Sequence, residues 1–378
     1  MHIFGHSLKL KFLLGTLLCG LFLTGCVGDR FAPKGWAGPT VSDEVIYVVS
    51  PKGDFLAIDA EDQSIRDLTP KLEEQPSSLF GCQGASTPAL AAYSTPIVSE
   101  GIAYVAAHDG EVFAIKATNG AEIWRYKTYG TIVGNPALAG GTLVVASGDE
   151  LIALDIHNSG DLLWNVPFKA DGEIWGNLGI ADGKVYFGDM KHNLYAVNIE
   201  SGRLAWENMF NGAITSAPLI VENVLYIGTF ESKFYALDTS DGDPKWGEPF
   251  IAEDWFWSTP AYNDGVIYVG SIDGNIHAID AVTGKAKWSN PVTTDGKIRA
   301  AAIISEDVLI VADDSGFVYG LDVETGQQAW APRDLDEKVM ADPWVEDTTV
   351  YLLTEDSVLY ALNTESGNQL WSKSLEQE

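Results

Sequence analysis

Apolar and polar residues alternate over short stretches of this chain, and turn residues separate the stretches at regular distances. Near residue 270, Ile267 and Val269 share one side of an expected strand, because side chains alternate between the two faces with a period of two. The pairs Asp264–Gly265 and Asp273–Gly274 suit hairpin turns, where glycine accepts a positive φ at little cost. Together with a last strand that carries Trp288, this pattern predicts four short strands and leaves no room for an ordinary helix.

The same unit recurs along the chain, and a tryptophan marks its end. Successive copies of this tryptophan are 40 to 42 residues apart. They are Trp124, Trp164, Trp206, Trp246, Trp288, Trp330 and Trp371. An earlier copy at 53–59 matches the third strand, but Asp67 stands where its tryptophan is expected. A repeat of this length built from strands is typical of propeller blades. The sequence therefore predicts an all-β protein, an eight-bladed β-propeller of four-stranded antiparallel blades spanning residues 36–378.

The repeated tryptophan has a structural explanation. One blade cannot bury both of its faces alone, so stacking against its neighbours supplies the core. A flat indole on an outer strand would bury about 150–250 Å² between two blades. We therefore interpret the seven tryptophans as residues that dock one blade on the next, in preference to a cofactor-binding motif.

The repeat also resembles a known family. The pattern [DG]-x-[VI]-[YF]-[VA]-[GS]-x-x-[DG]-x-x-[YF]-A-[LI]-[DN]-x-x-[TS]-G-x-x-x-W is similar to the tryptophan-docking repeat of the PQQ-like β-propeller superfamily, over about residues 35–375. One branch contains quinoprotein alcohol dehydrogenases, which hold pyrroloquinoline quinone (PQQ) and a metal. Another contains non-enzymatic lipoproteins similar to BamB, a subunit of the machinery that assembles outer-membrane β-barrels. Both branches are eight-bladed, so the fold does not choose between them.

Other residues favour the lipoprotein branch. The resemblance to quinoproteins would imply two adjacent cysteines beside the quinone and long insertions that build an active site. The chain has three cysteines, none adjacent to another, and its repeats carry few additions. The resemblance therefore implies a binding protein that needs no cofactor, with a PQQ-dependent oxidoreductase or PQQ-binding protein as the alternative.

The N-terminus resembles a lipoprotein signal. A basic start is followed by the apolar stretch 12–23, which is shorter than the ~20 residues of a membrane span. It ends in Leu23-Thr24-Gly25-Cys26, which resembles a bacterial lipobox. We expect a signal peptide at 1–25, acylation of Cys26 and a short tether at 26–35. The predicted location is extracytoplasmic, with the lipid anchored in the cell membrane or the outer membrane.

Charge and cysteine content narrow the partners. The formal net charge of −30 disfavours nucleic acid, whose phosphates such a surface repels. It also disfavours contact with anionic lipid beyond the anchor itself. Cys82 has no internal partner, so no disulfide is expected to stabilise the fold. It lies in an insertion at about 68–92, which is either a contact loop or a surface excursion.

No metal site is predicted. The histidines beyond the signal, His108, His157, His192 and His277, lie far apart and lack ligand spacing. Asp-Gly segments such as 313–316 fall at hairpin turns, where these residues are favoured for backbone reasons.

The repeat predicts one candidate binding site. Innermost strands line the central channel of a propeller. One residue per repeat stands three positions before the proline site that begins the first strand, so these eight side chains should form a ring at one channel mouth. They are Trp36, Tyr93, Val133, Trp175, Thr215, Trp257, Arg299 and Met340. We expect Trp36, Tyr93, Trp175, Trp257 and Arg299 to bind a peptide, a glycan or a flat ring ligand. Alternatively, the ring members pack on one another and plug the channel.

These patterns favour a monomeric, lipid-anchored scaffold that binds envelope proteins. The resemblance to BamB implies a role beside a β-barrel assembly complex, by edge-strand addition or by capture at the channel mouth. A cell-surface binder of glycans or other ligands is a further alternative. How the ring closes, through residues 372–378 or through the tether, is left open by the sequence.

Overall fold

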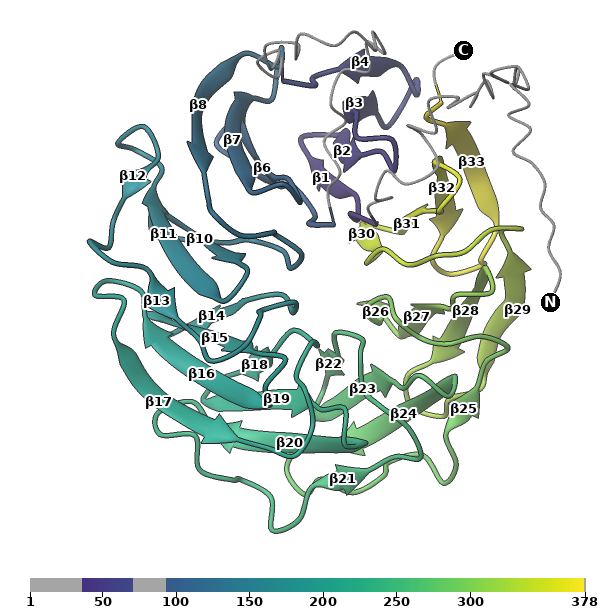
Figure 1. Cartoon of the computed structure of the whole chain (residues 1–378). Coiled ribbons are helices and arrows are strands. Elements are labelled where there is room, and N and C mark those ends of the chain that lie inside the picture. The colour runs from purple at the N-terminus through teal and green to yellow at the C-terminus, as the bar shows by residue number, and fades with distance from the viewer. Residues whose placement is uncertain (1–35, 71–92, 377–378) are drawn as a thin grey trace, which may run out of the picture.

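The chain folds into a closed ring of eight blades around a central axis (Figure 1). The computed structural model describes residues 36–70 and 93–376, and every named element in them is a strand. The predicted signal peptide, Cys26, the tether, Cys82 and nearly all of the predicted insertion lie outside the described residues.

Blades 1 to 4 come from the first half of the chain. Their strands are β1 (Thr40–Ser42), β2 (Val45–Val49), β3 (Phe55–Asp59) and β4 (Ile65–Asp67); β5 (Ile97–Ser99), β6 (Ile102–Ala106), β7 (Glu111–Lys116) and β8 (Glu122–Lys127); β9 (Ala137–Ala139), β10 (Thr142–Ser147), β11 (Glu150–Asp155), β12 (Asp161–Leu162) and β13 (Phe168–Lys169); and β14 (Gly179–Ala181), β15 (Lys184–Gly188), β16 (Asn193–Asn198) and β17 (Leu204–Met209).

Blades 5 to 8 follow in order. Their strands are β18 (Leu219–Val221), β19 (Val224–Gly228), β20 (Lys233–Asp238) and β21 (Phe250–Ile251); β22 (Ala261–Asn263), β23 (Val266–Gly270), β24 (Asn275–Asp280) and β25 (Val292–Thr293); β26 (Ile303–Ser305), β27 (Val308–Ala312), β28 (Phe317–Asp322) and β29 (Gln328–Asp334); and β30 (Trp344–Glu346), β31 (Thr349–Leu353), β32 (Val358–Asn363) and β33 (Gln369–Ser374).

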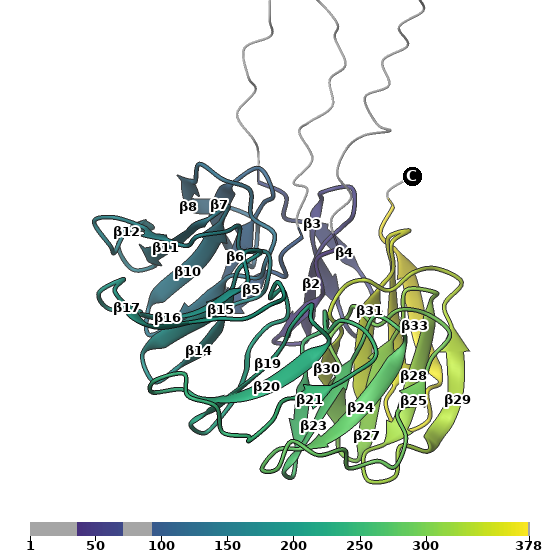
Figure 2. The ribbon, with the colours of Figure 1, turned by 60° about the horizontal axis from the view of Figure 1, so that its bottom comes forward.

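Within each blade the strands are antiparallel and follow chain order from the axis outward (Figures 1 and 2). The innermost strand is short, and the second and third strands form the buried centre of the blade. The prediction of an eight-bladed propeller with four-stranded antiparallel blades is therefore confirmed.

The outer strand of blades 3, 5 and 6 differs from the simple prediction, because it is interrupted near its tryptophan. Only two-residue pieces remain beyond that point, at β13, β21 and β25. In all three blades a proline stands three residues after the tryptophan: Pro167, Pro249 and Pro291. Proline has no N–H to donate to the neighbouring strand, so it breaks the ladder there.

Six of the seven repeated tryptophans are buried at the junction with the next blade. Trp246 shows the contact in full. Its Nε1 donates to the Ala281 carbonyl of blade 6 at 2.9 Å, and the Tyr226 hydroxyl donates to the same oxygen at 3.1 Å. The indole packs on Gly284, where an added Cβ would lie 2.6 Å from a ring carbon. Gly284 also has a φ of 70°, so glycine is required there both for space and for backbone conformation.

Blade 1 is docked differently on both of its sides. On one side, Trp371 of blade 8 is only half-buried, and Gln63 stands with a φ of 56° where the other blades have the turn glycine. On the other side, Asp67 does not occupy the tryptophan place as the residue count suggested. Arg66 pairs with Ala57 in that register, and its guanidinium donates to the Thr118 carbonyl of blade 2 at 3.0 Å. Leu68 is buried against Gly120 in place of the indole.

The ring closes without a strand shared between the chain ends. Blade 8 is complete with β33, and blade 1 is complete with β1 to β4. Side chains of the two blades form one hydrophobic cluster, in which Val48 and Leu56 of blade 1 join Leu353 and Leu375. Residues 369–374 therefore supply the last strand of blade 8.

His277 is the one buried histidine of the described chain. Its Nε2 lies 3.1 Å from the Ser271 hydroxyl, and Phe250 and Phe256 contact its ring edge-on. Burial lowers the pKa of His277 to about 4, partly offset by the nearby Asp273 carboxylate. The imidazole is therefore neutral in the folded protein at neutral pH.

We expect this histidine to make the fold sensitive to acid. An unfolded histidine binds a proton near pH 6.5, whereas the folded His277 resists protonation until about pH 4. The contribution of His277 to the free energy of unfolding is therefore complete above pH 6.5. It falls by about 3 kcal/mol as the pH drops from 6.5 to about 4. His277→Phe, which follows Phe113 at the equivalent place in blade 2, should remove that part of the pH dependence in urea unfolding curves. An unchanged slope between pH 6.5 and pH 4 would contradict the assignment.

Candidate functional site

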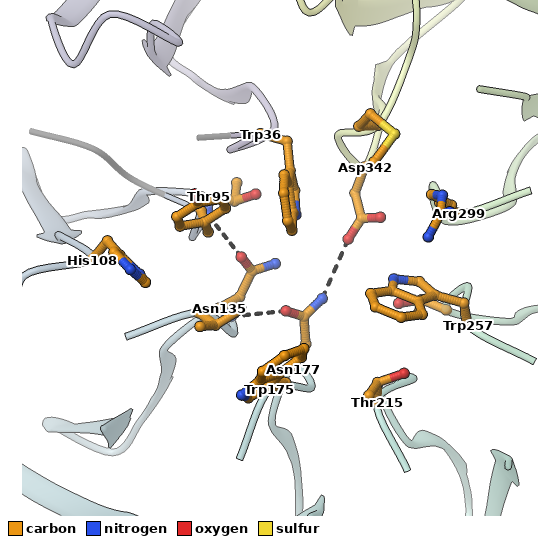
Figure 3. Close-up of a pocket in the computed structure, with 14 residues that line it drawn as sticks. Trp36, Thr95, His108, Asn135, Trp175, Asn177, Thr215, Trp257, Arg299 and Asp342 are labelled. Carbon is orange, nitrogen blue, oxygen red and sulfur yellow. Dashed lines mark hydrogen bonds between the residues drawn. The ribbon is translucent and has the colours of Figure 1, made fainter. Parts of the chain in front are cut away.

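A cavity of about 240 Å³ lies at one mouth of the central channel, and all eight blades contribute to it (Figure 3). All eight predicted ring residues lie on its wall: Trp36, Tyr93, Val133, Trp175, Thr215, Trp257, Arg299 and Met340. We call this cavity the channel-mouth cup. These side chains lie together because each occupies the same position of its repeat, shortly before the innermost strand of its blade.

The aromatic side chains of the cup only partly pack on one another. Trp36 contacts Tyr93 edge-on with ring centres 4.4 Å apart, and Tyr93 contacts His108 at 4.8 Å. Trp36 and Trp175 nevertheless remain 38% and 40% exposed. The indoles of Trp36, Trp175 and Trp257 stand around the opening (Figure 3). The cup is thus an aromatic-walled space, and its aromatic residues do not fill it.

Five of the eight inner segments carry a polar side chain two residues beyond the ring residue, and all five line the cup: Thr95, Asn135, Asn177, Thr259 and Asp342. The backbone N–H of Thr95 donates to Asn135 Oδ1 at 2.6 Å, and that of Asn135 donates to Asn177 Oδ1 at 2.7 Å. In the same way Ala301 donates to Asp342 Oδ1 at 2.7 Å. The side chains of Asn135, Asn177 and Asp342 therefore each fix the backbone of the preceding blade, and we call these three residues the polar layer.

One hydrogen bond of the polar layer crosses the channel. Asn177 Nδ2 donates to Asp342 Oδ2 at 3.3 Å, although the two residues belong to blades 4 and 8 on opposite sides of the ring (Figures 1 and 3). The polar layer therefore bridges the channel at the cup. The sequence analysis missed these residues as site residues. The available signal was a short acceptor residue directly before the strand-start proline, as in Asn135-Pro136 and Asp342-Pro343.

The cup holds separated positive and negative groups. The Arg299 guanidinium lies 5.4 Å from the Trp257 ring centre, and its Nε is 3.5 Å from Asp314 Oδ2. Desolvation raises the pKa of Asp342, although its hydrogen bonds from Ala301 and Asn177 act in the opposite direction. The Thr215 hydroxyl is buried and has no hydrogen-bond partner.

An aromatic strip continues from the cup onto the outer face. Phe230 stacks with Trp257 on the cup wall at 5.5 Å and with Trp255 at 4.8 Å. Trp255 is 45% exposed. The strip thus extends the aromatic surface beyond the cavity itself.

No metal centre is assembled in the part of the chain that the structure describes, since it contains no group of three or more His, Cys, Asp or Glu suited to one. His108 lies on the cup wall, while His277 is buried in blade 6. Among the same residues, no helix has the length and apolar character to cross a membrane.

Comparison with known proteins then identifies the family. The model of the outer membrane protein assembly factor BamB matches residues 74–169, 157–302, 248–335 and 296–378, which together cover blades 2 to 8. The chain belongs to the BamB family. This agrees with the predicted PQQ-like repeat and with the lipoprotein branch of the resemblance.

Individual relatives are distant. BamB of Legionella pneumophila is 24% identical over 225 residues, covering 57% of this chain and 54% of the relative. BamB of Moranella endobia is 24% identical over 168 residues, covering 40% and 42%. A tetrathionate hydrolase of Acidithiobacillus ferrooxidans is 23% identical over 203 residues, covering 45% and 40%. The chain spans about half the length of these relatives or less.

Solved structures share the fold. BamB from Moraxella catarrhalis superposes with a TM-score of 0.65 at 20% identity, covering 74% of this chain and 87% of that one. The computationally designed Ika8 protein gives a TM-score of 0.67 at 15% identity, covering 75% and 87%. A natural BamB-family propeller and a designed protein thus have similar backbones, so the function has to be argued from the site.

Proposed function

We propose that this protein is a non-enzymatic envelope scaffold that assists the assembly of outer-membrane β-barrel proteins. The observation that carries the proposal is the match of the BamB family model across residues 74–378. The cup supports a binding role, because it offers aromatic walls, a polar layer and an open mouth at the centre of one face. Such a site suits recognition of a segment of another protein.

We further propose that Cys26 is acylated and holds the propeller at a membrane surface. Trp36, the first described residue, is part of the cup wall. It follows Cys26 by ten positions, and an extended chain of that length reaches at most about 35 Å. A lipid on Cys26 would therefore keep the cup close to the membrane, where precursors of outer-membrane proteins and a β-barrel assembly complex would be its partners.

Genetic complementation tests the assembly role. In a bacterium that lacks its own BamB-family gene, the full chain is expected to restore the amount of folded β-barrel protein in the outer membrane, measured by heat-modifiable mobility on gels. Cys26→Ser should leave the chain in the soluble fraction and restore much less, because anchoring concentrates it at the membrane. No restoration by a folded, anchored chain would contradict the proposal. Binding of PQQ with calcium, accompanied by dye-linked alcohol oxidation, would show an enzyme instead.

A further inference from the structure

The channel-mouth cup has the size of a single aromatic side chain. A closed apolar cavity of about 150 Å³ already accommodates benzene. The cup, at about 240 Å³, holds one ring with a polar substituent, whereas sites for larger ligands begin near 300 Å³. Three indoles stand around the opening, so a ring that enters meets aromatic surface on several sides.

The inner end of the cup is polar. The carboxylate of Asp342 and the amide of Asn135 line the cup together with the indoles. Asn135 Oδ1 accepts a hydrogen bond from the Thr95 backbone, while its Nδ2 makes no hydrogen bond among the described residues. Beside them lies Thr215, whose buried hydroxyl is unpartnered. Buried polar groups without partners are rare in folded proteins and call for a ligand or a compensating contact. A purely hydrocarbon ring would leave the Thr215 hydroxyl and Asn135 Nδ2 unpaired, while a phenol can accept from the Asn135 amide and also donate to the Asp342 carboxylate.

The surroundings of the cup suit a polypeptide in extended form. Side chains on the same side of a strand are about 6.5–7 Å apart, so the neighbours of an inserted side chain would fall beside the cup. There they meet the strip of Trp257, Phe230 and Trp255. The strands of outer-membrane barrels alternate apolar and polar residues and carry girdles of aromatic residues.

We propose that the channel-mouth cup binds the side chain of a single tyrosine presented by an extended polypeptide segment, with the ring among the indoles and the hydroxyl at the polar layer. This inference rests on the proposed function, because an assembly factor for β-barrels meets unfolded strands rich in aromatic residues. The inference adds to that function the kind of side chain that the cup binds.

Labelled peptides test the selectivity directly. The probes are ten-residue peptides of alternating serine and valine with a central tyrosine, phenylalanine or leucine, and binding to the full chain is measured by fluorescence anisotropy. We expect the tyrosine peptide to bind at least 10-fold more tightly than the leucine peptide. It should also bind about 3- to 10-fold more tightly than the phenylalanine peptide, which lacks the hydroxyl.

Variants separate the ring contact from the hydroxyl contact. Trp257→Leu should weaken the tyrosine and phenylalanine peptides alike by about 10-fold. Asp342→Asn and Thr215→Val should each remove the preference for tyrosine over phenylalanine, because they act on the groups that meet the hydroxyl. Thr215→Val retains the side-chain shape and removes a hydroxyl that has no partner, so it should fold normally even where Trp257→Leu does not. Tyr129→Ser, on an exposed side chain outside the cup, is the control and should change nothing.

The outcomes separate this inference from the proposed function. Equal binding of the tyrosine and leucine peptides, or a tyrosine preference that survives both Asp342→Asn and Thr215→Val, overturns the inference. So does an oligosaccharide that occupies the cup and displaces the peptides, because it would mark a glycan site. If the chain restores β-barrels but shows no peptide preference, only the cup assignment fails. If the tyrosine preference appears in a chain that restores no β-barrels, the assembly role fails and the tyrosine site stands.

Discussion

Replacing Trp246 with alanine is expected to lower the free energy of unfolding by about 3–5 kcal/mol, the usual cost of truncating a buried aromatic side chain to alanine. The indole is buried between blades 5 and 6 and packs on Gly284. Its loss leaves a cavity and removes one of two donors to the Ala281 carbonyl. Urea unfolding followed by far-UV circular dichroism measures the change.

Two control variants locate the source of this effect. Trp246→Phe keeps an aromatic ring and removes the N–H, so it should cost less than the alanine variant, since Tyr226 still donates to Ala281. Trp371→Ala should also cost less, because that indole is half-buried and because Gln63 stands at the turn position that glycine holds in the other blades. Equal losses for Trp246→Ala and Trp371→Ala would contradict docking through a buried indole on glycine.

Replacing Asp189 with alanine should destabilise the protein by a similar amount, about 3–5 kcal/mol. This side chain is fully buried at the turn between β15 and β16. Its carboxylate accepts hydrogen bonds from the backbone of Gly172 and Asn193 at 2.9 and 2.8 Å and from the Tyr195 hydroxyl at 3.0 Å. Alanine would leave several buried donors without an acceptor, each costing about 1–3 kcal/mol. Burial, followed by the effect of the carboxylate, raises the pKa of Tyr195, so the phenol remains a donor at neutral pH.

Asp189→Ser is the matched variant for this position. Blade 6 has Ser271 at the equivalent turn, where its hydroxyl donates to the Asn275 carbonyl at 3.2 Å and lies 3.1 Å from His277 Nε2. Serine at 189 should therefore restore part of the loss, as seen in unfolding midpoints at neutral pH. A loss for Asp189→Ala below 1 kcal/mol would mean that water replaces the carboxylate and that the turn does not depend on it.

The blade repeat was predictable from the sequence because each blade is one contiguous segment. The spacing of Trp124 to Trp371 gives the period directly, and a position counted from each strand start gave eight of the fourteen residues that line the cup. Such inferences require only that equivalent residues take equivalent places. They were least reliable where a copy had diverged. In blade 1, Arg66 and Leu68 together make the contacts with the next blade that one indole makes in the other blades.

Contacts between distant blades could not be predicted in this way. The hydrogen bond from Asn177 to Asp342 joins residues 165 positions apart, and it exists only because the ring brings blades 4 and 8 face to face. No periodic pattern encodes this contact, because it breaks the symmetry of the repeat.

Blade 1 has a mechanical consequence that follows from its docking. It is the segment held by the least indole contact, with a half-buried Trp371 on one flank and Leu68 on the other. It is also the segment into which the N-terminal stretch leads, through Trp36. Tension along that stretch would therefore act first on blade 1, the blade with the weakest contacts to its neighbours. Trp36 would move with blade 1, so tension on the N-terminal stretch would widen the cup.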